Sequence, residues 1–231
     1  MWQALRNELA PKGVEIVSVA MDTGGANVAK PWVEAARPEH PSLLDVEHTI
    51  GALFGVVNVP NSVWIDEDGR IVRPVEPAHP NDTPRDLAKW AITEEMPELM
   101  RDMLTEANKI EIDAVGYVAR LRDWAEKGAM SEFVLDPDAT RRTSGKRTEA
   151  QSRAAAHFEL GQHLWRAGHE ADAKPHFRAA HRLFPENWTY KRQAWTFSHP
   201  MQGPTEDYDS SWLEDIREIG AENYYPPLVV A

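Results

Sequence analysis

Cysteine is absent from all 231 residues of the chain. Without a thiol the chain forms no disulfide, and it offers no thiolate nucleophile and no sulfur ligand for a metal. These residues alone therefore cannot carry out reactions in which a cysteine attacks a disulfide or a peroxide.

Long apolar runs and positive charge are also scarce. No run approaches the roughly 20 apolar residues of a membrane-spanning helix, and the N-terminus lacks a charged-then-apolar signal pattern. Lys and Arg number 25 against 37 Asp and Glu, a net charge of -12. Binding along nucleic acid needs clustered cations, and the basic group in residues 141–147 is too short for that. We expect a cytoplasmic protein without a membrane or nucleic-acid partner.

Several site signatures are missing as well. The chain has no phosphate-binding loop, no dinucleotide-binding glycine motif and no convincing Ser-His-Asp set, so we expect no cofactor. Five histidines in residues 157–181 invite a metal interpretation, but no two lie three or four residues apart on a helix. We expect no metal site and place these histidines on a solvated surface. His40 and His48 are expected in a loop and at a helix start.

The first half of the chain alternates predicted helices and strands. With 42% hydrophobic residues the chain can build a real core. Helices are predicted at residues 1–9, 31–36 and 47–54, and strands at residues 13–21 and 42–45. Two further strands, residues 62–65 and 70–72, flank the acidic turn 66–69, which is typical of a hairpin. We therefore expect an α/β domain.

Residues 53–72, LFGVVNVPNSVWIDEDGRIV, strongly resemble the thioredoxin-like thiol–disulfide oxidoreductases, and most closely their cytochrome-maturation and alkyl hydroperoxide reductase relatives. The resemblance covers roughly residues 1–75, with a helix at residues 83–91 as the expected end of the domain. It implies a cis peptide bond at Val59-Pro60, beside the surface on which a substrate strand docks. Val59 and Pro60 are thus the expected site-adjacent residues. The resemblance implies a protein partner or a protein disulfide as substrate.

The same resemblance places the nucleophile at the start of the first helix and a central strand before it. Both are missing, and the helix at residues 1–9 has no capping Ser, Thr, Asp or Asn. We interpret this as a missing first strand and redox motif. A selenocysteine codon read as a stop would account for such a start. The alternative is a redox-inactive paralogue that keeps the fold for binding alone.

Helices dominate the second half of the predicted chain. Apolar residues recur at helical spacing from residue 87 to 104, with Pro97 as a break, and from residue 112 to 125. Residues 137–147 are rich in Asp, Pro, Arg, Ser, Gly and Lys, and we predict an exposed linker there. A short helix is predicted at residues 212–219, and we expect the apolar end of the chain, residues 224–230, to dock onto the protein.

Residues 154–187 match one tetratricopeptide repeat, a pair of packed helices. Gly161 and Ala173 would let the helices approach, Leu164 and Phe177 would fill the space between them, and Gly168 would end the first helix. The full set of predicted packing residues is Leu160, Gly161, Leu164, Gly168, Ala173, Phe177, Ala180 and Pro185.

A lone repeat must pack on neighbours, and residues 188–195 are predicted to form a further helix. Its aromatic residues Trp188, Tyr190 and Trp195 either belong to a capping helix in the core or line a surface for a partner. The sequence favours the core interpretation.

The sequence thus predicts an incomplete α/β thioredoxin-like domain, lacking its first strand and redox motif, within residues 1–110. An all-α domain with a tetratricopeptide-type hairpin would follow in residues 111–231. The expected function is a thiol–disulfide oxidoreductase or peroxiredoxin-like protein, inactive without its nucleophile. The alternative is a noncatalytic protein-interaction module.

Overall fold

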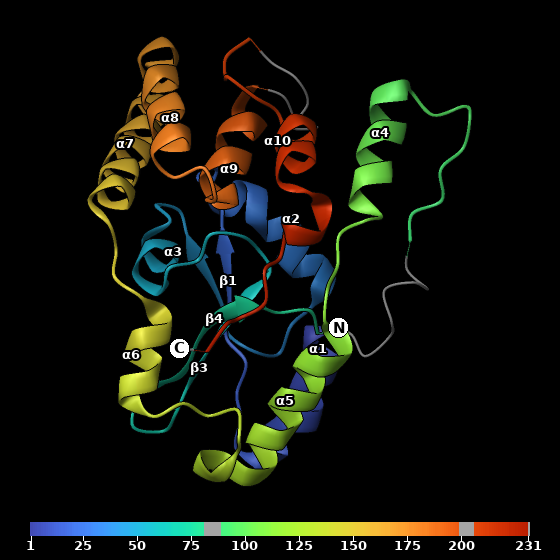
Figure 1. Cartoon of the computed structure of the whole chain (residues 1–231), viewed down its shortest axis with the longest axis vertical. Coiled ribbons are helices and arrows are strands. Elements are labelled where there is room, and N and C mark those ends of the chain that lie inside the picture. Colours follow the sequence, from blue (N-terminus) through green and yellow to red (C-terminus); the bar gives the residue numbers. More distant parts are fainter. Residues whose placement is uncertain (81–88, 199–205, 231) are drawn as a thin grey trace.

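The computed structural model describes residues 1–80, 89–198 and 206–230. The protein is a mixed α/β structure in which two small sheets lie in the middle (Figure 1). Helices α7, α8, α9, α10 and α4 lie toward one end of the molecule, and α1 and α5 lie toward the other (Figure 1). In the described ranges, no helix combines the length and apolar character required to cross a membrane.

The first sheet pairs β1 (Ser18–Met21) with β2 (Ser42–Asp45) in parallel, with Ser18 opposite Ser42 and Met21 opposite Asp45. Strand β1 is shorter than the predicted strand at 13–21, because β2 offers only four residues for pairing. Helix α2 (Ala26–Ala36) connects the two strands. It starts before the predicted position, since Gly25 at φ 68° begins it and Pro31 lies inside it. The helix ends at Ala36 as predicted.

The second sheet is an antiparallel hairpin of β3 (Asn61–Ile65) and β4 (Ile71–Pro77). The predicted turn is confirmed: one Asp66 carboxylate oxygen accepts hydrogen bonds from the backbone N–H of Asp68 and Arg70 at 3.1 and 2.8 Å. Gly69 has a φ of 77°, which glycine adopts without strain. Helix α3 (Thr49–Phe54) precedes this hairpin and ends at Gly55, as the sequence predicts.

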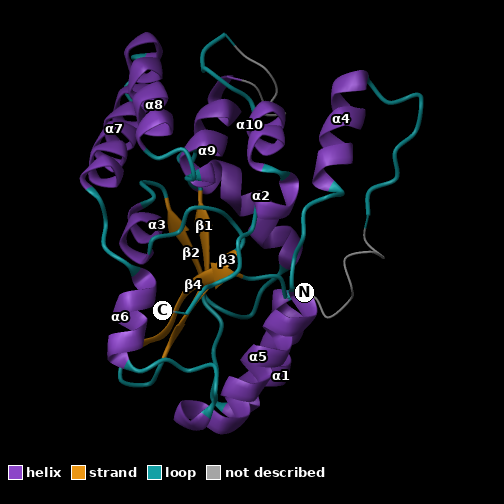
Figure 2. Ribbon diagram, viewed as in Figure 1, coloured by secondary structure: helices purple, strands orange, loops and turns teal. Residues whose placement is uncertain are grey.

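The strands of both sheets lie in the middle of the molecule (Figure 2), but no strand of one sheet pairs with a strand of the other. Within the described residues, β1 has a strand partner on one side only, and so has β3. The far side of β4 is covered, because the backbone N–H of Leu135 donates to the carbonyl of Val72 at 2.8 Å. The outer edge of β3 has no strand partner in the described residues.

One hydrophobic cluster surrounds the hairpin. Helices α1 (Trp2–Leu9) and α5 (Ala114–Lys127) pack there, with Leu9 fully buried and the ring of Trp64 stacked on Trp124 at 5.0 Å. Short 3-10 turns, Ala10–Lys12 and Gly128–Met130, follow the two helices.

A second, larger cluster holds the other helices together. It contains α7 (Glu149–Arg166), α8 (Glu170–Leu183), α9 (Trp188–Ser198) and α10 (Trp212–Ile219), and α4 (Glu98–Ala107) packs against it. The 3-10 turn Ala221–Asn223 closes this cluster. The packing does not follow a boundary near residue 110, because α4 joins the second cluster and α5 the first.

The predicted linker at 137–147 is wrong. Residues Pro137–Ser144 form α6, and its Asp136 cap accepts hydrogen bonds from the N–H groups of Asp138 and Ala139. Pro137 stands at the first helical position, and Gly145 follows the end. Capping and terminal charge thus form a helix without any apolar periodicity.

The predicted helix at 83–91 falls mainly on residues 83–88, outside the described ranges, and residues 89–91 are not helical. The predicted helical stretch from residue 87 to 104 is wrong before Pro97, because residues 89–97 are not helical. Pro97 is instead the residue that precedes the first turn of α4.

Candidate functional site

The segment before β3 carries the residues that the sequence marks as site-adjacent. The Val59-Pro60 peptide bond is cis, as expected. Asn58, immediately before it, is buried, whereas Val59 is 37% exposed. The role of Val59 and Pro60 beside a redox centre remains a prediction.

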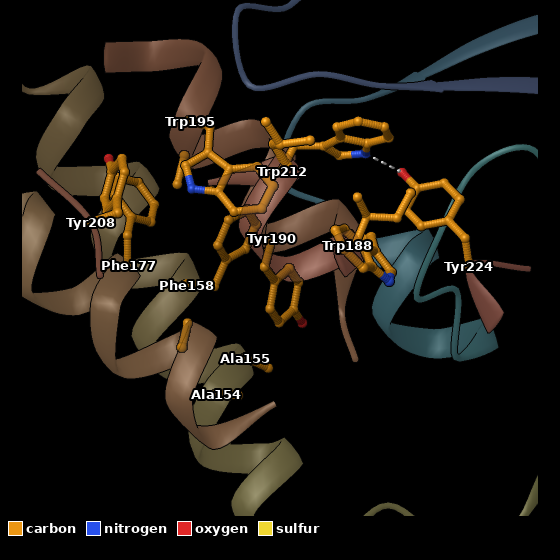
Figure 3. Packing of buried hydrophobic residues seen from close by; sticks show 14 of the residues in the cluster. Ala154, Ala155, Phe158, Phe177, Trp188, Tyr190, Trp195, Tyr208, Trp212 and Tyr224 are labelled. Atoms are coloured by element: carbon orange, nitrogen blue, oxygen red, sulfur yellow. Dashed lines mark hydrogen bonds between the residues drawn. The ribbon is translucent and has the colours of Figure 1, made fainter. Parts of the chain in front are cut away.

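The C-terminal segment covers this position. Asn58 Nδ2 donates to the carbonyl of Tyr224 at 3.0 Å, and the Tyr225 hydroxyl donates to the carbonyl of Val59 at 2.7 Å. Tyr224 is buried in the larger cluster, and its hydroxyl accepts a hydrogen bond from Trp212 Nε1 at 3.3 Å (Figure 3). The chain end is therefore anchored at its two tyrosines. Beyond them the predicted docking is wrong, because Val229 and Val230 are exposed.

Helix α9 also contacts this segment. The backbone N–H of Trp188, at the start of α9, donates to the carbonyl of Val57 at 2.7 Å. A helix start has unpaired N–H groups, so the Val57 carbonyl satisfies one of them. The larger hydrophobic cluster thus contacts the segment directly before Val59-Pro60.

A buried polar network lies at the carboxyl ends of β1 and β2. The backbone N–H of Thr23 donates to Gln193 Oε1 at 3.0 Å, and the same oxygen lies 3.3 Å from His48 Nε2. Gln162 Nε2 donates to the Thr23 hydroxyl at 2.5 Å. Thr23 and His48 lie in the segments that follow β1 and β2, whereas Gln162 and Gln193 come from α7 and α9. The network therefore joins the first sheet to the helices of the larger cluster.

His48 is the titratable group in this network. It starts α3 at a φ of 56°, its ring contacts Phe158 edge-on at 5.1 Å, and it is 3% exposed. Burial lowers the pKa of the imidazole, because it disfavours the charged form of the ring. His48 Nδ1 and Gln162 Oε1 are buried without a hydrogen-bond partner. The expected position of His48 at a helix start is confirmed, and helices α7 and α9 bury its ring.

The α7–α8 hairpin places most predicted packing residues as expected. A Cβ atom on Gly161 would lie 2.7 Å from the ring of Phe177, so the helices approach too closely there for any larger residue. Ala173, Phe177 and Ala180 are fully buried, and Leu164 packs at the edge of the cluster. Gly168 has a φ of 83° in the connection, and Pro185 follows the end of α8. Leu160 differs: it is 43% exposed, so its predicted packing role is wrong.

The aromatic residues of α9 belong to the core. Trp188, Tyr190 and Trp195 are at most 4% exposed, and the ring of Tyr190 stacks on Phe158 at 4.1 Å (Figure 3). Hence the capping interpretation holds, and these three residues form no partner surface. They are buried because α9 lies between the hairpin and α10.

Of the five histidines expected on a solvated surface, His163 and His169 are exposed as predicted, whereas the other three are not. His181 is buried, and burial is the main reason why its pKa falls to about 3. His157 and His176 are partly buried with their Nδ1 atoms 2.9 Å apart. Burial, with His176 and Arg153 nearby, lowers the pKa of His157. Spacing along one helix could not reveal this pair, but a hairpin register could, since both residues lie at similar distances from the connection.

The described residues contain no group of three or more potential metal ligands of the His, Cys, Asp or Glu type. The site as a whole offers buried hydrogen-bond donors and acceptors and a buried imidazole, but no thiol.

Comparisons with known proteins identify no relative: no family model, no curated protein and no solved structure matches the chain.

Proposed function

We propose that these residues form part of a thioredoxin-like redox protein, a thiol–disulfide oxidoreductase or a peroxiredoxin-like enzyme. In this proposal a strand that is not among them lies between β1 and β3 and leads into α1. That strand would bring the nucleophile to the side of Val59 and Pro60.

The observation that supports this most is the arrangement of the strands. In the described chain, β1 of the parallel pair and β3 of the antiparallel hairpin each have a strand partner on one side only. Such edges expose unpaired backbone groups, which proteins usually cover. One added strand would satisfy both edges and unite the pairs into a single mixed sheet.

The chemistry follows from what the chain has and lacks. Attack on a disulfide or a peroxide needs a sulfur or selenium nucleophile, and the chain has no cysteine. A thiol at the start of α1 would gain acidity from the positive end of the helix dipole. The present residues would supply the scaffold and the surface beside that thiol.

The test compares the chain with a version extended by the residues encoded in frame upstream of Met1. Both are assayed for dithiol-dependent reduction of insulin and of peroxide. We expect activity only in the extended protein, and loss of that activity when its nucleophile is replaced by alanine. If both proteins are folded and neither reduces insulin or peroxide, the proposal is contradicted.

A noncatalytic interaction module is the second candidate, and exposed apolar side chains on α2 favour it. Val28 and Trp32 lie one helical turn apart and are 45% and 76% exposed. If the extended protein is inactive, this surface should be tested next. The measurement is whether Trp32→Ser changes the sedimentation coefficient of the chain.

A further inference from the structure

The C-terminal segment lies over the loop that leads into β3. It runs from α10 toward the β3–β4 hairpin (Figure 1). There the Tyr225 hydroxyl donates to the Val59 carbonyl at 2.7 Å, and the ring of Tyr225 contacts the ring of His79 edge-on at 4.9 Å. Tyr225 therefore covers the backbone immediately before Pro60.

Both backbone hydrogen-bonding groups of Val59 have partners. The Val59 N–H donates to Asn58 Oδ1 at 2.9 Å, and the Val59 carbonyl accepts from Tyr225. Asn58 Nδ2 donates in turn to the carbonyl of Tyr224 at 3.0 Å. An extended protein segment binds largely through main-chain N–H and C=O groups. Such a segment would therefore have to compete with these partners for Val59.

The two tyrosines of the C-terminal segment are held to different degrees. Tyr224 is 3% exposed, and its ring contacts the ring of Trp188 at 4.6 Å. Tyr225 is only partly buried, and the two prolines that follow it, residues 226–227, are exposed. Proline has no backbone N–H, so these two residues cannot donate to a neighbouring strand. Tyr225 can therefore leave Val59 while Tyr224 stays anchored.

We propose that Tyr225 is a specificity-determining residue: it restricts protein substrates at the surface beside the nucleophile and leaves small substrates unrestricted. This inference rests on the proposed function, in which the nucleophile lies beside Val59 and Pro60. A protein disulfide needs the main chain at Val59 and competes with Tyr225 for it. A small electrophile reaches the nucleophile without pairing with that main chain.

The test uses the N-terminally extended protein and its Tyr225→Phe variant, which keeps the ring and removes only the hydroxyl. We expect kcat/KM for the reduction of insulin to rise about fivefold, since one neutral hydrogen bond changes an equilibrium by about that factor. Deletion of residues 225–231 also removes the ring and should raise this value at least as much. Iodoacetamide is a small electrophile, and it should alkylate the nucleophile at the same rate in all three proteins.

Val229→Ser is the matched control. Val229 lies in the same segment and is 78% exposed, so its replacement should leave insulin reduction unchanged.

The outcomes separate this inference from the proposed function. If both Tyr225 variants reduce insulin no faster than an active extended wild type, the inference is overturned and the proposed function stands. An equal rise in the alkylation rate would also overturn the inference, because Tyr225 would then shield the nucleophile from every reagent. If neither the folded extended wild type nor either variant reduces insulin or peroxide, the proposed function fails and the inference fails with it.

Discussion

At the scale of single residues, small side chains set the distances on which the helical half depends. Gly161 is the clearest case, because the ring of Phe177 occupies the space that a side chain would need. From the repeat spacing, the sequence predicted that Gly161 permits a close approach and that Phe177 fills the space between the helices, but not that the two face each other. It could not predict the burial of His48 and His181, since a histidine has the same local pattern in a core and on a surface.

Gly161→Val should lower the free energy of unfolding by about 1–3 kcal/mol, because the added methyl groups clash with Phe177. Urea denaturation measures the change. Ala156→Val is the matched control: it adds the same β-branching on an exposed position of α7 and should have a much smaller effect. Equal losses in both variants would show that the close approach has no energetic importance.

His181 makes stability depend on pH. Its pKa is about 3 in the folded protein, below its ordinary value, so the unfolded chain binds the proton more readily. The stability that this group contributes is complete above about pH 6.5 and declines as the pH falls toward the folded value. Between pH 6.5 and 5 the decline due to His181 should be about 2 kcal/mol.

The measurement is urea denaturation at pH 6.5 and pH 5 for wild type and His181→Leu. The variant should lose clearly less stability over this interval, although burial of His48 acts in the same direction. If the free energy of unfolding fell equally in the two proteins between pH 6.5 and pH 5, the pKa of His181 would not be lowered by folding.

At the scale of elements, β4 depends on a buried ion pair. Arg73 donates to both Glu76 carboxylate oxygens, at 2.7 and 2.9 Å, and to the carbonyl of Phe133 at 3.0 Å. The guanidinium also lies 5.3 Å from the ring centroid of Trp64. These contacts connect the hairpin to the segment before α6.

Arg73→Met should destabilise the protein by about 3 kcal/mol or more, because it removes the main partner of a buried carboxylate. Arg120, 3.8 Å from Glu76, compensates only in part. The double variant Arg73→Met/Glu76→Leu should lose less, since no charge stays unpaired. Chemical denaturation of both variants checks this, and a larger loss in the double variant would refute the argument.

Element prediction succeeded where local signals were strong. The α10 boundaries match residues 212–219, and the β3–β4 turn follows from its Asp and Gly residues. It failed at α6, where Asp136 and Pro137 begin a helix with few apolar residues, and at α2, which starts before Pro31. A helix cap depends on only a few residues, so its signal is hard to recognise within a polar segment of sequence.

At the scale of the whole molecule, contacts between residues far apart in the sequence determine how the sheets meet the helices of the larger cluster. The cis peptide bond at Val59-Pro60 could be predicted from residues 53–72. The C-terminal segment that covers this bond could not. The Tyr225 hydroxyl reaches Val59 across 166 positions of sequence, and no local pattern encodes such a contact. The same holds for Gln162 and Thr23, which are 139 positions apart.

Tyr224→Ala should destabilise the entire fold by about 3–5 kcal/mol, because the ring packs on Trp188 and Trp212 beside Asn58. Tyr224→Phe keeps the ring and should cost only about 1 kcal/mol. Far-ultraviolet circular dichroism and tryptophan fluorescence should report one shared, shifted transition. If only one of the two signals showed the shifted transition, the two hydrophobic clusters would unfold separately.

The central claim is that β1 and β3 are the two neighbours of one absent strand. Nuclear magnetic resonance of the N-terminally extended protein tests it most directly, through contacts between backbone protons of adjacent strands. We predict a new strand with cross-strand contacts to β1 on one side and to β3 on the other. Direct pairing of β1 with β3, or an extension that contacts neither, would contradict the account.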